Sequence, residues 1–119
     1  MSQNFDPGDF LVFQLESGYG LLRVIAVDQA QSDTVWHLAG YDEFFLDVDS
    51  AESAIAREEA LKASHDHIAL TNRAFESTQV ARLTNVPLND LDSAAYRRWL
   101  ADPGREVSDR SVRLMLGLR

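Results

Sequence analysis

The chain has 119 residues, of which 45% are hydrophobic and 25% are charged, and this composition predicts a single domain over residues 1–119. The absence of cysteine excludes disulfide frameworks, thiolate nucleophiles, iron–sulfur clusters and cysteine zinc sites. The formal net charge of −8 argues against a protein that coats the phosphate backbone of nucleic acid, so we expect no nucleic-acid partner.

A β-hairpin is predicted near the N-terminus. Residues 10–15 are apolar except for Gln14, which indicates a largely buried strand. The connector, residues 16–20, contains two glycines, and residues 21–27 return to an apolar pattern. We therefore expect residues 10–15 and 21–27 to pair as antiparallel strands.

A third strand is predicted over residues 34–41. Its alternating pattern places His37 on one face of the strand and Trp36 on the other. The next segment, residues 44–48, mixes apolar and acidic side chains, and it fits either a short strand or an ordered bend.

The middle of the chain predicts a helix over residues 51–63. Asp49 and Ser50 can cap its N-terminus, and Glu52 lies in its first turn, where the helix dipole favours an acid. The elements expected after it are strands at 67–71 and 79–83 and helices at 90–101 and 109–116.

Together these elements predict an α+β protein. Strands that follow one another as hairpins, rather than alternating with helices, favour an antiparallel sheet. We expect five or six strands in a curled sheet or a small barrel or roll, with one helix in mid-chain and two C-terminal helices.

No targeting or membrane-spanning segment is predicted. Residues 1–7 lack a basic start followed by an apolar stretch. The longest apolar runs contain four residues, whereas a transmembrane helix needs about twenty. We expect a cytoplasmic protein without a membrane partner.

Catalytic chemistry has little support in the sequence. His65 and His67 could project from one face of a strand and share a metal ion, with His37 or an acid as a third ligand. Two ligands are too few, and the spacing lacks the helical pair of a metalloprotease, so solvated histidines are the simpler interpretation. We expect no catalytic residues, no metal and no cofactor.

Charge is distributed unevenly along the chain. Residues 1–60 contain two basic and twelve acidic residues, a net charge of −10. Residues 61–119 contain nine basic and seven acidic residues, a net charge of +2. If the protein recognises a partner electrostatically, the acidic half should do so.

One segment resembles a known family. The string GDFLVFQLESGYGLLRVIAV, residues 8–27, is similar to the opening of the immunity protein 26 family of small bacterial barrel-like domains. These proteins begin with a Gly-Asp turn, an apolar strand, a Gly-Tyr-Gly-like hairpin and a strand that carries a basic residue. The matching positions here are Gly8, Asp9, Phe13, Leu15, Gly18, Tyr19, Gly20, Arg23 and Val24.

The resemblance implies a non-enzymatic bacterial domain that binds and blocks a toxin. An acidic surface suits a basic toxin, because complementary charge speeds and orients association. Aromatic anchors inside a charged rim are typical of protein interfaces. The residues expected to form such a patch are Tyr41, Asp42, Glu43, Phe44, Phe45, Asp47, Asp49 and Glu52.

Two other hypotheses remain open. The first is a homo-oligomeric scaffold module, a homodimer formed by the C-terminal helices through Trp99, Val112 and Met115. The second is a small hydrolase or metal-dependent enzyme centred on His65 and His67.

Overall fold

An antiparallel sheet with three helices forms the α+β fold that the pattern of elements predicts. The computed structural model describes residues 5–30, 33–41, 43–57, 61, 63–110 and 112. The elements in chain order are β1 (Asp9–Leu15), β2 (Gly18–Ala30), β3 (Asp33–Tyr41), α1 (Val48–Ala56), β4 (Ala63–Thr71), α2 (Asn72–Glu76), β5 (Val80–Asn85) and α3 (Ala94–Ala101).

The sheet has five strands in the order β4-β3-β2-β1-β5. The first four strands form a meander, and β5 returns across the molecule to pair with β1. The predicted antiparallel pairing of the first two strands is confirmed, but the turn is shorter than the predicted connector 16–20: Leu15 pairs with Gly18, so residues 18–20 belong to β2. Within the described residues β4 and β5 are the two outer strands, so the sheet is open and does not close into a barrel, and Ser108 forms an isolated bridge with Leu70 at the β4 edge.

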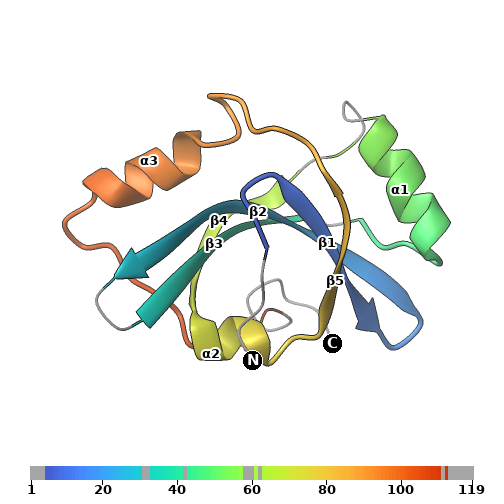
Figure 1. Ribbon diagram of the computed structural model, residues 1–119, viewed down its shortest axis with the longest axis horizontal. Coiled ribbons are helices and arrows are strands. Elements are labelled where there is room, and N and C mark those ends of the chain that lie inside the picture. The colour runs from blue at the N-terminus through green and yellow to red at the C-terminus, as the bar shows by residue number, and fades with distance from the viewer. Residues whose placement is uncertain are drawn as a thin grey trace.

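The helices cover opposite faces of this sheet (Figure 1). Helix α2 lies against one face, where Ala74 and Phe75 join the larger core cluster. Helices α1 and α3 lie over the other face, at opposite ends, and the connection from β5 to α3 passes between them (Figure 1). The connection from β5 to α3 therefore separates the two helices on that face (Figure 1).

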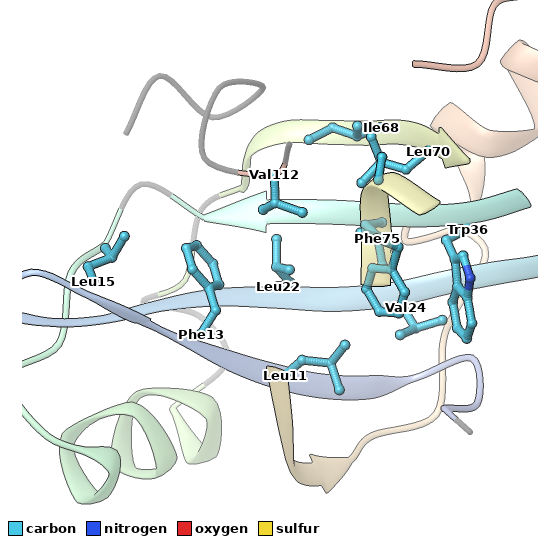
Figure 2. Packing of buried hydrophobic residues seen from close by; sticks show 12 residues of the cluster. Leu11, Phe13, Leu15, Leu22, Val24, Trp36, Ile68, Leu70, Phe75 and Val112 are labelled. Carbon is cyan, nitrogen blue, oxygen red and sulfur yellow. The ribbon is translucent and has the colours of Figure 1, made fainter. Parts of the chain in front are cut away.

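The larger core lies between the sheet and α2. Figure 2 shows Phe75 reaching from α2 toward Val24 and Trp36. The rings of Trp36 and Phe75 stack with centroids 4.3 Å apart. Burial of apolar and aromatic surface of this kind is the main stabilising term in a domain of this size. The alternation predicted for β3 is confirmed, because Trp36 belongs to this core whereas His37 points to the opposite face.

A buried carboxylate ties the edge strand β5 to β1. Asp9 has an exposed fraction of 2% and accepts hydrogen bonds from Arg82 Nε (2.7 Å), Asn85 Nδ2 (2.8 Å) and the backbone N–H of Asp6 (2.8 Å). Burial acts to raise the pKa of Asp9, but these hydrogen bonds and the charge of Arg82 outweigh it and lower the pKa below its usual value.

Helix α1 begins and ends earlier in the chain than the helix predicted over residues 51–63. Its N-cap is Asp47, whose carboxylate accepts from the Ser50 N–H at 2.7 Å, so α1 begins before the predicted start. Arg57 leaves the helical region with φ −106° and ψ 61°. Ala63 already pairs with Tyr41 as the first residue of β4, which ends any helix before that point.

The C-terminal half also departs from prediction at two places. Residues 90–93 form a turn rather than the start of a helix, because Asn89 and Asp92 bond each other's backbone N–H groups through their side chains at 2.8–2.9 Å. The short helix α2 stands where only a connector was predicted. Most of the helix predicted over 109–116 lies outside the described residues.

Candidate functional site

Two exposed apolar side chains lie in the segment between β3 and α1. Phe44 has an exposed fraction of 47% and Leu46 one of 78%. The segment is held to the β1–β2 hairpin by a two-way backbone bridge between Phe45 and Tyr19, with N···O distances of 2.7 and 2.9 Å. Phe44 lies directly over Gly18, where an added Cβ would approach its ring to 2.4 Å. The glycine therefore provides the space that lets Phe44 lie on the hairpin.

Exposed acids occur throughout this region. We define the acidic surface as Phe44 and Leu46 together with the exposed carboxylates of the hairpin, the segment and α1, which are Glu16, Glu43, Asp49 and Glu52.

Asp47 also belongs to this region but has a structural task. Its carboxylate caps α1, and the hydrogen bond from Ser50 lowers the pKa of Asp47. A substitution at Asp47 would therefore change helix α1 as well as the charge of the surface.

The aromatic residues predicted for the patch divide into two groups. Phe44 is exposed, whereas Tyr41 and Phe45 are buried, with exposed fractions of 9% and 6%. Tyr41 packs against Phe10, and both buried residues belong to the core cluster beneath α1. Tyr41 and Phe45 thus support the surface from below, and Phe44 is the aromatic group available to a partner. Asp42 lies outside the described residues.

A chain of polar side chains connects strands β2, β3 and β4 beneath α3. His37 Nε2 lies 2.8 Å from Asp28 Oδ2, and His37 Nδ1 lies 2.8 Å from His67 Nε2. His37 itself has an exposed fraction of 0%. We call Asp28, His37 and His67 the histidine chain.

The hydrogen-bond partners determine the tautomers of both rings. A carboxylate can only accept, so His37 must donate to Asp28 from Nε2. A neutral His37 then has only a lone pair at Nδ1, and His67 must donate to it from Nε2. In this arrangement both rings are neutral, and Nδ1 of His67 carries a lone pair.

The environment of the histidine chain favours the neutral state. Burial and, to a smaller extent, the charge of His37 lower the pKa of His67 to about 4. Burial also lowers the pKa of His37, although Asp28 opposes this shift by hydrogen bonding and by its charge.

Helix α3 covers the histidine chain with two aromatic residues. Tyr96 donates its hydroxyl to Asp28, with the two carboxylate oxygens at 2.8 and 3.0 Å. Burial and this contact with Asp28 raise the pKa of Tyr96 to about 12. The ring of Trp99 lies 4.7 Å from that of His37, and its Nε1 donates to the Glu106 carbonyl at 2.9 Å. The contacts of α3 with the sheet are thus largely polar and aromatic.

The metal-binding interpretation of His65 and His67 gains no geometric support. His65 Nδ1 lies 3.1 Å from Ser64 Oγ, whereas His67 bonds His37. Both ring nitrogens of His37 already have protein partners, so His37 cannot serve as the third ligand in this arrangement. In the part of the chain that the structure describes, no three His, Asp or Glu side chains converge on a point that could hold a metal ion.

Sequence reasoning missed Asp28 and Tyr96. Asp28 lies near the end of β2 and belongs to no recognisable sequence motif. Counting back from the β2–β3 turn, where Ala30 pairs with Asp33, places Asp28 opposite Val35 and close to His37 across the strand pair. Cross-strand counting was the available signal, and it depends on knowing the turn. Tyr96 gives no such signal, because its contact with Asp28 joins residues 68 positions apart.

The residues suggested for a homodimer have contacts within the chain. Val112 is 1% exposed and belongs to the larger core, so it is not available to a second copy. Trp99 packs on the histidine chain, and Met115 lies outside the described residues.

Comparisons with known proteins give no relative for this chain. No protein-family model matches it, and no curated protein or solved structure is significantly similar to it. Among the described residues, no helix is both long and apolar enough to cross a membrane.

Proposed function

We propose that this chain is a protein-binding domain that captures a basic protein through its acidic surface. The observation that carries the proposal is the pair of exposed apolar side chains, Phe44 and Leu46, among exposed carboxylates. Protein interfaces commonly combine a few large apolar anchors with a polar rim.

The charge distribution supports the same surface. The first sixty residues carry a net charge of −10, which would attract a basic partner over distances of about 10 Å at moderate salt. Phe44 and Leu46 would then lose contact with water in the complex, which supplies affinity that the exposed charges alone do not.

The class of partner is a further step of the proposal. Residues 8–27 resemble the immunity protein 26 family, and this resemblance favours a toxin as the partner. A basic nuclease toxin would complement the acidic surface, since such enzymes must attract a polyanion themselves. Binding without catalysis is the activity that this proposal assigns to the chain.

The test compares two charge-reversed variants against a panel of purified basic nuclease domains. In Asp49→Lys/Glu52→Lys, two acids of the acidic surface are reversed without touching the α1 cap at Asp47. In the control, Asp90→Lys/Glu106→Lys, two exposed acids elsewhere are reversed, so the net charge changes equally. Association and dissociation rates are measured by biolayer interferometry at low and moderate salt.

We expect the Asp49/Glu52 variant to associate about tenfold more slowly than the wild type, and the control to stay close to it. Phe44→Ala/Leu46→Ala should instead speed dissociation, because apolar anchors act mainly after encounter. An equal loss of association rate in both charge variants would mean that net charge alone causes the effect. That result would contradict the assignment of binding to the acidic surface. Failure of the wild type to bind any member of the panel would count against a nuclease partner.

A further inference from the structure

A cavity lies between α3 and the sheet, apart from the acidic surface and from the histidine chain. Its volume is about 290 Å³, and its apolar part includes Ile25, Ala39 and Tyr41 from the strands. This volume is at the lower end of the range for ligand sites in proteins, which run from roughly 300 to 1,000 Å³. A ligand of this cavity must therefore be small.

Arg23 brings a buried and incompletely bonded cation to the cavity. Its exposed fraction is 7%, and its guanidinium lies over the ring of Phe10. Nη2 donates to the Val86 carbonyl at 2.8 Å, and Nη1 lies 3.3 Å from Asp92 Oδ2. Nε is buried and has no hydrogen-bond partner among the described residues. The guanidinium thus keeps one donor without an acceptor, and Arg23 brings an incompletely satisfied positive charge to the cavity lining.

Two further charged residues line the cavity and form no ion pair with another described residue. Arg98 of α3 and Asp66 of β4 are both exposed lining residues. Neither of them takes part in an ion pair in the described part of the chain. With Arg23 and Asp92, the lining contains two cations and two anions, and one of each sign is left unpaired.

We infer that this cavity binds a small α-amino acid in its zwitterionic form. The carboxylate faces the two arginines of the lining, Arg23 and Arg98, and the ammonium group faces Asp66. The apolar strand residues contact a short side chain. A simple anion would satisfy the arginines but leave Asp66 without a counter-charge, whereas a zwitterion matches both signs in a lining of zero net charge.

The experiment uses three probes that share a four-carbon skeleton and differ in the charged groups they carry. They are L-2-aminobutyrate, which carries both charges, butyrate, which carries only the carboxylate, and 2-aminobutane, which carries only the ammonium. Each is titrated into the ¹⁵N-labelled protein, and the Arg23 Nε–H resonance and the backbone resonances of α3 are followed by NMR. We expect L-2-aminobutyrate to bind about tenfold more tightly than either single-charge probe, with a shift of the Arg23 resonance.

Exposed variants test the site without disturbing the buried Arg23. Arg98→Gln and Asp66→Asn should each weaken binding of L-2-aminobutyrate about tenfold. Arg97→Gln, the adjacent exposed arginine of α3, does not line the cavity and should leave binding unchanged. Butyrate binding as tightly as L-2-aminobutyrate would overturn the assignment to a zwitterion. No resonance shift at about 20 mM of L-2-aminobutyrate, a concentration that detects binding of only about 2–3 kcal/mol, would overturn the site itself.

Discussion

His37 is the most constrained polar residue of the second sheet face. It is fully buried, and each ring nitrogen has a hydrogen-bond partner in a neighbouring strand. A buried polar group that keeps all its hydrogen bonds costs little, whereas one that loses a partner is strongly destabilising. Protonation of His37 at Nδ1 would replace an acceptor by a donor and leave two N–H groups facing each other.

The histidine chain predicts a loss of stability on acidification. The pKa of His67 falls from 6.5 to about 4 on folding, and that of His37 is also lowered. Between these values the unfolded chain binds more protons than the folded one, so the free energy of unfolding rises with pH. The contribution of the histidine chain to this free energy is lost as the pH falls from about 6.5 to about 4. After allowance for the partial exposure of His67, the loss is about 2 kcal/mol.

Urea unfolding followed by circular dichroism at several pH values measures this loss. His67→Gln removes one of the two titrating groups, so its stability should vary less over the window than that of the wild type. His65→Gln is the matched control, because His65 lies outside the histidine chain, and it should keep the wild-type pH dependence. Equal pH dependence in His67→Gln and the wild type would show that His67 does not titrate as proposed.

At the scale of elements, α3 differs from the strands in how it is held. None of its residues is buried. Its anchors are the Tyr96 hydrogen bonds to Asp28, the ion pair of Arg23 with the adjoining residue Asp92 and the packing of Trp99. Elements with few buried apolar contacts open at lower free energy than the core.

This anchoring predicts that α3 opens without global unfolding. Backbone amides of α3 should exchange with solvent faster than those of β2, which is a central strand. Tyr96→Phe removes the hydroxyl that holds α3 to Asp28 and should lower the opening free energy by about 1 kcal/mol, equivalent to roughly fivefold faster exchange.

Hydrogen exchange measured by NMR checks this prediction. Tyr19→Phe is the matched control, because Tyr19 makes its hydrogen bonds to described residues through its backbone rather than its hydroxyl. Unchanged exchange of α3 in Tyr96→Phe would mean that the Asp28 contact does not hold the helix.

The elements also show what local sequence can predict. The pairing of β1 with β2 is predictable because two apolar runs are separated by a short polar break, whereas its register is not, because Gly18 and Gly20 pair within β2 instead of forming the turn. Helix α2 is not, because five residues give no helical period, and the burial of Phe75 against Trp36 stabilises it from outside. The predicted helix end at residue 63 is wrong because Ala63 pairs with Tyr41 in β4, a contact that local sequence does not reveal.

The candidate sites also combine features that local sequence predicts with features that depend on distant contacts. Local composition identifies the acidic segment with Phe44, because acids and aromatics are adjacent in the sequence. The burial of Tyr41 and Phe45 beneath it depends on the core under α1, which composition does not reveal. The histidine chain and the cavity join residues from four elements, and their assembly depends on strand order and on the path from β5 to α3.

At the scale of the whole molecule, the buried Asp9 and its partners Arg82 and Asn85, which we call the Asp9 cluster, connect the first described strand of the chain, β1, to the last, β5. Asp9 bonds Arg82 and Asn85, which follow it by 73 and 76 residues. These bonds hold β5 in place after the chain has crossed the molecule. Contacts of such long sequence separation form late, because the intervening loop must first be ordered.

Asp9→Ala should therefore destabilise the whole fold by about 2 kcal/mol, because it removes the buried carboxylate that accepts hydrogen bonds from Arg82, Asn85 and the Asp6 backbone. Asp6→Ala removes a neighbouring exposed carboxylate and should change stability little. Chemical denaturation of both variants measures the difference. Equal stability of Asp9→Ala and Asp6→Ala would mean that the cluster does not stabilise β5.

The two tryptophans occupy very different surroundings. Trp36 is buried against Phe75, whereas Trp99 lies with its ring 4.7 Å from His37 and 5.6 Å from His67. A charged imidazolium this close to an indole perturbs its excited state, whereas Trp36 packs in the core on the opposite face of the sheet and should respond less. The molecule thus carries its own optical probe, and the emission of Trp99 reports the protonation of the histidine chain without any attached dye.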